Sequence, residues 1–237
     1  MTLIENVDER TAPEPPPPSR PSKPFWRRPW ILPLAAVVAV YLYMQIEPVA
    51  GVPEEQLFLP PHDDYPLYYP LLVIHMSAAT LAMITMVLQV WPRMRLQFPK
   101  VHRVSGRIYV IGAVIGGLSG LGIVFWAPMP GKVGSLCMLL FWLGTTVAAY
   151  RYARRGQWAK HRRHMLYSFA VAANNPWAFF FYVATSEMGI MIDPIYFGEG
   201  GRWIPWVGNL MLVQWWLYRT ARRPAPVPAS VARAGEA

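Results

Sequence analysis

The chain has 237 residues, of which 54% are hydrophobic and only 15% are charged. A typical soluble domain carries about 25% charged residues, so this composition excludes an ordinary soluble globular protein. The net charge of +9 does not indicate a nucleic-acid-binding protein, because the basic residues lie between long apolar runs, where a bilayer explains them. A single cysteine, Cys137, excludes an intrachain disulfide and any cysteine-based zinc or iron–sulfur motif.

Six apolar runs follow a polar, proline-rich segment, residues 1–29, which we expect to be a disordered tail. We interpret each run as a membrane-spanning helix, although the first is near the lower limit of about 17–25 residues for a span. The runs cover residues 30–46, 67–90, 108–127, 133–150, 165–185 and 203–218. Residues 219–237 are basic and rich in proline and alanine, and we expect a second disordered tail there.

Lysine and arginine are concentrated on one side of these runs. The cluster 151–163 and Arg219 fall on that side, whereas the opposite side has only Lys132 and Arg202. The positive-inside rule then places both tails in the cytoplasm, and an even number of spans agrees with this. The sequence therefore predicts an all-α integral membrane protein, a six-helix transmembrane bundle of the plasma or inner cell membrane. Its predicted partners are the bilayer and its anionic headgroups.

One histidine, His75, lies inside an apolar run. An ionisable group at such depth is costly unless it is paired or functional, so His75 is a candidate site residue. The alternative is a neutral imidazole bonded to a helix carbonyl or a hydroxyl. At about 1.5 Å per residue, His75 lies about 25 Å from the basic end of its helix and cannot share a metal with histidines there. Met138 is the best candidate for a second ligand at its depth.

Three further histidines, His102, His161 and His164, lie at the basic boundary among arginines. One interpretation is contact with anionic lipid headgroups, worth about 1 kcal/mol per basic residue. The other is a site in which His102 and His161 ligate a b-type haem. The arginines that would pair with its propionates are Arg103, Arg107 and Arg162. His164 ranks below His161 for this role.

Two features within the runs have structural and functional interpretations. The stripe Gly112, Gly116 and Gly120 permits close approach of another helix, and it equally makes room for a flat macrocycle. The sequence Asn174-Asn175-Pro176 interrupts the fifth apolar run, where the two amides bond a carbonyl at a kink or line a polar cavity. The acidic residues all lie outside the runs, which disfavours proton-coupled transport through buried carboxylates.

Several of these residues together resemble a bacterial membrane-protein family called domain of unknown function 2306. The pattern covers about residues 71–183 and consists of His75, His102-Arg103-x-x-Gly106-Arg107 and His161-Arg162-Arg163-x-Met165. His164 departs from it, because that family usually has an aromatic residue there, and the two asparagines before Pro176 depart as well. The family has no established activity, so the resemblance implies no reaction. The histidines are also loosely similar to those of cytochrome b561-type haem proteins.

The leading functional hypothesis is a membrane redox or haem-handling protein with one b-type haem at the basic side. An alternative is a binding or carrier protein for a small lipophilic or anionic molecule, with His75, Asn174 and Asn175 lining the site. A third is a structural or assembly subunit without a catalytic site, which works through a membrane-protein partner.

Overall fold

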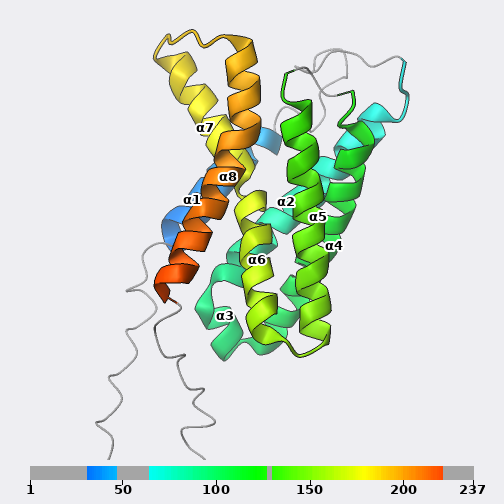
Figure 1. Cartoon of the computed structure of the whole chain (residues 1–237), viewed down its shortest axis with the longest axis vertical. Helices are drawn as coiled ribbons and strands as arrows, with labels where there is room; N and C mark the ends of the chain where they lie inside the picture. Colours follow the sequence, from blue (N-terminus) through cyan, green and yellow to red (C-terminus); the bar gives the residue numbers. More distant parts are fainter. Residues whose placement is uncertain (1–30, 47–63, 127–129, 221–237) are drawn as a thin grey trace, which may run out of the picture.

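A computed structural model of the protein describes residues 31–46, 64–126 and 130–220. The two predicted tails lie outside these ranges, apart from the first residues of the second tail. Regular structure in the described residues is entirely helical (Figure 1). The helices are α1 (Ile31–Ile46), α2 (Tyr68–Val90), α3 (Pro92–Gln97), α4 (Pro99–Ile123), α5 (Lys132–Arg154), α6 (Trp158–Ala172), α7 (Asn174–Glu187) and α8 (Pro194–Thr220).

Three of these helices, α2, α4 and α5, are long and apolar enough to cross a membrane, and α1 is a shorter apolar helix. Their outer faces carry large apolar side chains. Leu81 is 52% exposed, and Ile111 and Leu118 are each 59% exposed. Several small and hydroxyl-bearing residues face inward instead, among them Gly112, Gly116, Ser119 and Thr146. This distribution suits a lipid solvent, in which small and polar residues mediate helix contacts, so the predicted all-α membrane fold class is confirmed.

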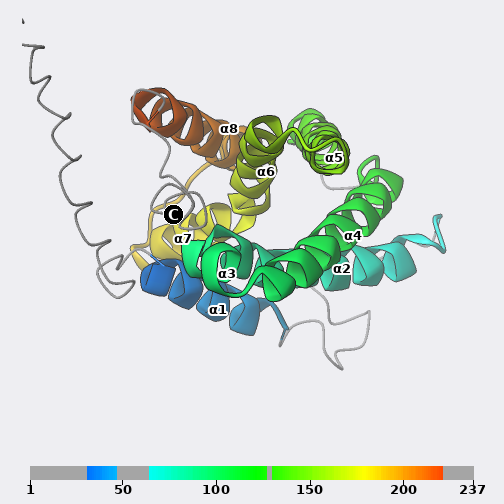
Figure 2. The same cartoon turned by 90° about the horizontal axis from the view of Figure 1, so that it is seen from below.

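The helices form a bundle in which α2 packs along α4, α4 on α5, and α5 on α6. Seen from below, α1 lies outside α2, and α8 lies outside α6 (Figure 2). Because α4 packs mainly on α2 and α5, while α6 packs mainly on α5 and α8, α4 and α6 lie across the bundle from one another.

The glycine stripe of α4 brings this helix close to α2. A Cβ on Gly112 would lie 2.8 Å from the carbonyl oxygen of Ala78, and one on Gly116 would lie 3.4 Å from the amide nitrogen of Ala79. At 2.8 Å a Cβ on Gly112 would be closer to a backbone atom than real Cβ atoms are found. The stripe therefore serves the close helix packing that was one of its two predicted roles.

The segment before α4 was predicted to be a basic turn, with the helix beginning near Ile108. It is instead the short helix α3, and α4 already begins at Pro99. Both helices have proline in the first turn, where its missing N–H costs nothing and its fixed φ favours the helix. The first turns of α4 are charged and less hydrophobic than the rest of the helix, but they are equally helical. A prediction from hydropathy alone therefore placed the start of this helix too late.

The fifth predicted span, residues 165–185, is two helices with Ala173 between them. Pro176 cannot donate to the carbonyl of Ala172, and its ring clashes with that carbonyl, so the helix breaks in the turn before it. Asn209 of α8 covers the break by donating from Nδ2 to the carbonyl oxygens of Ala170 at 3.0 Å and Ala173 at 3.4 Å. The predicted kink is thus a complete interruption that a third helix closes.

The last helix also starts earlier than predicted. Residues 186–202 were expected to form a polar loop, but α8 begins at Pro194, where the Asp193 carboxylate accepts a hydrogen bond of 2.8 Å from the Ile195 N–H. Such a side-chain acceptor stabilises a helix start. One turn later, the Glu199 carboxylate accepts a 2.8 Å hydrogen bond from the N–H of Gly131, directly before α5. The polar residues therefore fix α8 to α5 rather than form a loop.

Candidate functional site

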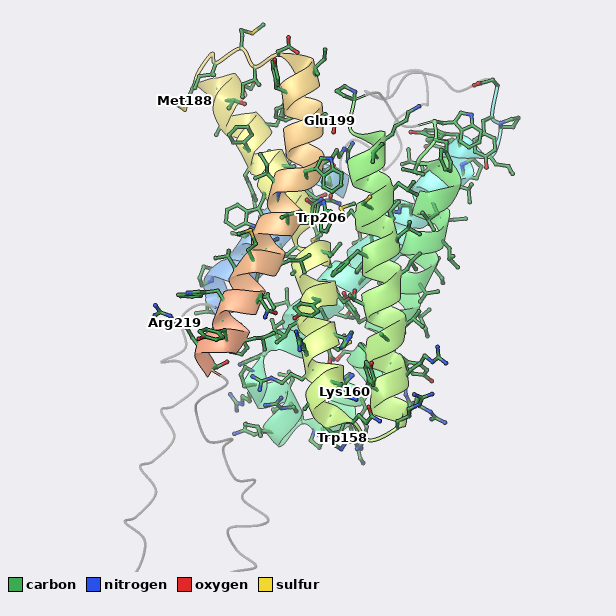
Figure 3. All side chains as sticks on the ribbon, viewed as in Figure 1. Trp158, Lys160, Met188, Glu199, Trp206 and Arg219 are labelled. Atoms are coloured by element: carbon green, nitrogen blue, oxygen red, sulfur yellow. The ribbon has the colours of Figure 1, made fainter. Side chains whose placement is uncertain are left out.

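The two ends of the bundle differ in charge. Trp158 and Lys160 lie at one end, and Met188 and Glu199 lie at the other (Figure 3). We call the first the basic end, because α3, the first turns of α4 and α6 and the last turn of α5 carry most of the arginines of the described residues. All predicted site residues except His75, Asn174 and Asn175 belong to this end.

A fully buried polar cluster joins three helices between the two ends. The hydroxyl of Tyr109 on α4 lies 2.6 Å from the Ser168 hydroxyl on α6, which lies 2.6 Å from the Thr146 hydroxyl on α5. Trp142 Nε1–H donates to the Tyr109 hydroxyl at 3.2 Å. Tyr109, Thr146 and Ser168 are each 0% exposed. The sequence analysis did not identify this cluster. It joins the face of α4 that carries Tyr109 to the face of α6 that carries Ser168.

The same two faces carry the basic-end histidines. Tyr109 follows His102 by seven residues, and Ser168 follows His161 by seven. Seven residues are close to two full turns, so each histidine lies on the face of its hydroxyl partner, about 10 Å nearer the basic end. In agreement, His102 lies within electrostatic range of His161. His102 and His161 thus belong to the faces of α4 and α6 that meet at Tyr109 and Ser168.

Each of the two rings has an unusual hydrogen-bond status. The Nδ1 atom of His161 lies 3.0 Å from the carbonyl oxygen of Ala149 on α5, so Nδ1 carries the proton and Nε2 is left with its lone pair. The Nδ1 atom of His102 is buried without a hydrogen-bond partner in the described part of the chain. Gln89 of α2 fixes the backbone below it, by donating to the His102 carbonyl at 2.8 Å and to the Ser105 hydroxyl at 2.6 Å.

The arginines are arranged differently from the prediction. Arg95 of α3 lies within electrostatic range of both His102 and Arg162. The guanidinium of Arg162 lies 5.3 Å from the centre of the Trp216 ring on α8. Arg103 and Arg107 are exposed on a face of α4 other than the one that carries His102. Arg95 was missed because the basic turn was not recognised as a helix; Pro92 at its start was the available signal.

His164 is separated from this pair. Its Nδ1–H donates to the carbonyl oxygen of Lys160 within its own helix at 2.8 Å, and its ring centre lies 4.9 Å from that of Tyr152 on α5. His164 follows His161 by three residues, so its side chain points about 60° away from the direction of the His161 side chain. The ring of His164 is therefore occupied by aromatic packing.

His75 is bonded to a helix carbonyl, as in the interpretation of this residue as a neutral imidazole. Its Nδ1–H donates to the Gly116 carbonyl oxygen on α4 at 2.7 Å, which leaves the Nε2 lone pair free. A Cβ on Gly120 would lie 2.9 Å from His75 Nδ1, so the third glycine of the stripe makes room for the imidazole ring.

A small cavity of about 40 Å³ lies beside this ring, with Met138 and Asn175 among its other lining residues. Asn175 also accepts a hydrogen bond of 2.9 Å from the Asn174 amide and is bonded to the Tyr41 side chain. The other amide atom of Asn174, Oδ1, is buried without a partner in the described residues. Of the two asparagines at the helix break, Asn175 thus lines the cavity, whereas the carbonyls of the break are bonded by Asn209.

The His75 cavity and the basic-end pair are separate places in the bundle. Within the described ranges, no group of three or more His, Cys, Asp or Glu side chains is arranged to hold a metal ion. A haem iron with two axial histidines requires only two protein ligands. Of all the predicted site residues, His102 and His161 come closest to meeting that requirement.

A comparison with known families gives one match. The family model described as "Predicted membrane protein (DUF2306)" matches residues 72–217. The match extends beyond the segment recognised by its motifs and reaches α8. No curated protein and no solved structure matches the chain. The matched residues run from the second turn of α2 through α7 to most of α8, and the chain therefore belongs to the domain of unknown function 2306 family of predicted membrane proteins.

Proposed function

We propose that this membrane protein binds one b-type haem between α4 and α6 at the basic end and acts in membrane electron transfer or haem handling. The axial ligands would be His102 and His161. The observation that carries the proposal is the matched spacing on the two helices. Tyr109 and Ser168 meet at 2.6 Å, and a histidine lies two turns from each on the same face.

The hydrogen bonds of the two rings fit ligation. A histidine that ligates a metal usually donates its other ring N–H to a carbonyl or carboxylate, which fixes its tautomer. His161 has this arrangement through the Ala149 carbonyl. The partnerless buried nitrogen of His102 is costly in a protein interior, and an additional ligand would relieve that cost.

The charges fit the acidic groups of such a cofactor. Arginine pairs well with carboxylates through its planar array of donors. Arg95 and Arg162 are close to each other and would otherwise repel, so carboxylates between them would be stabilising. Arg103 and Arg107 add positive charge on the outer face of α4. Bound haem would supply one-electron redox chemistry, while these residues bind and orient it.

The runner-up is a carrier or binding protein that uses the cavity beside His75. The observation that favours it is that His75 and Asn175, predicted together for this role, line one cavity. A volume of about 40 Å³ admits water-sized molecules and excludes a lipophilic ligand. The carrier role of this cavity would therefore be limited to a small polar or anionic molecule.

We also propose six membrane crossings with both tails on the cytoplasmic side of the cell membrane. In this arrangement α6 and α7 together make the fifth crossing, and α1 and α8 make the first and last. The support is the side-by-side arrangement of these helices with α2, α4 and α5 in Figure 1 and the concentration of arginine at one end. The third functional alternative, a structural subunit, shares this topology and has no cofactor.

The test is an absorption spectrum of the full-length protein, purified in detergent from cells supplied with a haem precursor. A b-type alpha band in the reduced-minus-oxidised spectrum is expected from the wild type. His102→Ala and His161→Ala should each lose it, whereas the control His164→Ala should keep it. A colourless wild-type protein, or a band that survives both substitutions, would overturn the haem proposal.

A further inference from the structure

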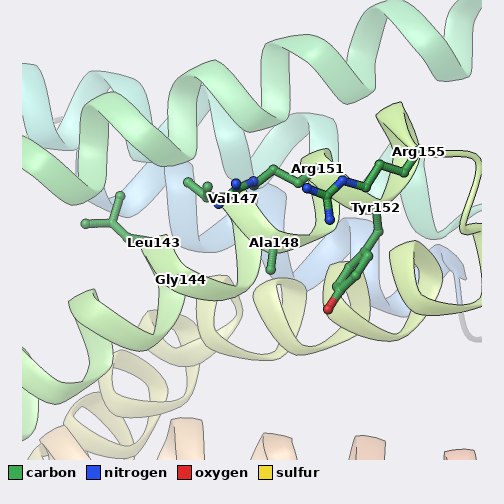
Figure 4. A pocket seen from close by; sticks show the side chains of 7 residues that line it. All are labelled: Leu143, Gly144, Val147, Ala148, Arg151, Tyr152 and Arg155. Carbon is green, nitrogen blue, oxygen red and sulfur yellow. The ribbon is translucent and has the colours of Figure 1, made fainter.

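A large groove lies on the outer surface of α5, away from both candidate sites. Its volume is about 540 Å³, and one end of its wall is apolar, with Leu143, Gly144 and Val147 (Figure 4). Arg151 and Arg155 form the other end. Such an amphipathic groove on a membrane-spanning helix faces lipid and the headgroup layer together.

The shape of the groove follows from small residues on one face of α5. Gly144 and Ala148 are one turn apart, and a Cβ on Gly144 would meet nothing within 4 Å. Larger residues at these positions would fill the space. The stretch from Leu143 to Arg155 is twelve residues, or about 18 Å of helix, close to half of the roughly 30 Å hydrocarbon core. The groove therefore runs from the headgroup layer into the hydrocarbon, and its apolar end can contact part of an acyl chain.

The charged end of the groove favours an anion. Both arginine side chains extend along α5 toward Val147, so their guanidinium groups lie beside the groove (Figure 4). Neither guanidinium has an ion-pair or hydrogen-bond partner in the described part of the chain. Lys160 adds a third cation, because its Nζ lies 5.5 Å from the ring centre of Tyr152, another residue of the groove wall.

We propose that this groove is a binding site for an anionic phospholipid of the surrounding bilayer. One acyl chain lies along Leu143, Gly144 and Val147, and the phosphate pairs with Arg151 and Arg155. Arginine binds phosphate through several parallel N–H donors. A zwitterionic headgroup binds arginine less tightly, because its own cation competes for the phosphate. The site is independent of haem binding, since none of its residues belongs to the His102–His161 pair.

The test is native mass spectrometry of the full-length protein in detergent, titrated separately with dioleoylphosphatidylglycerol and dioleoylphosphatidylcholine. The phosphatidylglycerol is expected to bind more tightly. Arg151→Gln and Arg155→Gln should each reduce that preference about fivefold, the effect of one basic residue near an anionic lipid surface. The matched control Arg154→Gln removes the same charge one position away from the groove and should leave the preference intact.

A second pair of variants tests the apolar end without changing charge. Gly144→Leu fills the groove and should weaken phosphatidylglycerol binding, whereas Gly208→Leu, on α8, should not. Both glycines have open space around a Cβ, so both variants should fold. Equal binding of the two lipids, an equal loss in Arg154→Gln, or unchanged binding in Gly144→Leu would each overturn the proposal. A change of oligomeric state in Gly144→Leu, without loss of lipid, would make the groove a protein contact instead.

Discussion

His75 donates its Nδ1–H to the Gly116 carbonyl at 2.7 Å, between α2 and α4, the two helices that pack most extensively on one another. Its ring is held against Gly120, where a Cβ would lie 2.9 Å from His75 Nδ1 and 2.9 Å from Leu139 Cδ2. Gly120→Ala should therefore destabilise the protein by about 1–3 kcal/mol, as overpacking of a core does. The measurement is the apparent melting temperature of the purified protein in detergent.

Gly208→Ala is the control for this prediction. A Cβ there meets nothing within 4 Å, and alanine in a helix is favoured over glycine by about 0.5–1 kcal/mol. Its melting temperature should equal or exceed that of the wild type. If both variants melt alike, the ring of His75 does not occupy the space above Gly120.

Removal of one hydroxyl from the buried polar cluster should be costly. Tyr109→Phe leaves the Trp142 N–H without its acceptor and removes one of the two hydroxyl partners of Ser168, and an unsatisfied buried group costs about 1–3 kcal/mol. Tyr150→Phe, on an exposed part of α5, is the control and should change little. Combining Tyr109→Phe with Ser168→Ala should cost less than the sum of the two single losses. Strict additivity of the melting shifts would show that the two hydroxyls do not interact.

The basic-end histidines should act as one unit if they share a ligand. His102→Ala and His161→Ala should each remove bound haem, measured as haem per protein after extraction, and the double variant should be no worse. His75→Ala should retain haem, because about 25 Å of helix separates it from the basic end. Headgroup contact would instead give small, additive losses of membrane affinity that decrease as salt screens the charges, and that pattern would argue against a shared site.

The proposed topology predicts which residues are accessible from outside the cell. Met191 is 96% exposed at the end opposite the arginines, and Gln157 is exposed between α5 and α6 at the basic end. In a background in which Cys137 is replaced by Ala, Met191→Cys should react with a membrane-impermeant maleimide on intact cells. Gln157→Cys should react only after permeabilisation. Labelling of Gln157→Cys on intact cells would reverse the orientation.

Uniformly apolar helices were predictable almost to the residue. The predicted span 67–90 corresponds to α2, Tyr68–Val90, because hydropathy and helix end together where Pro92 follows. The starts of α4 and α8 were placed too late, since their first turns are charged or polar and yet helical. Hydropathy reports where a chain meets lipid, whereas the helix is decided by capping residues and by proline.

The candidate site was predictable in its histidines but not in its surroundings. His102 and His161 were paired from their depth and their arginine-rich setting, and the seven-residue spacing to Tyr109 and Ser168 was also present in the sequence. The spacing from histidine to hydroxyl predicts a contact only once α4 and α6 are known to face each other. A hydroxyl in an apolar run usually donates to a carbonyl of its own helix. Thr85 and Thr145 do so, each with the carbonyl four residues before it.

The interruption at Ala173 also has a consequence for biogenesis. The carbonyls of Ala170 and Ala173 accept hydrogen bonds from the Asn209 amide, which is synthesised only after α6 and α7. In hydrocarbon an unsatisfied carbonyl costs several kcal/mol, so the pair of short helices is a poor lipid-soluble segment alone. We expect the translocon to retain α6 and α7 at its lateral gate until α8 emerges, and to release the three helices into the bilayer as one insertion unit.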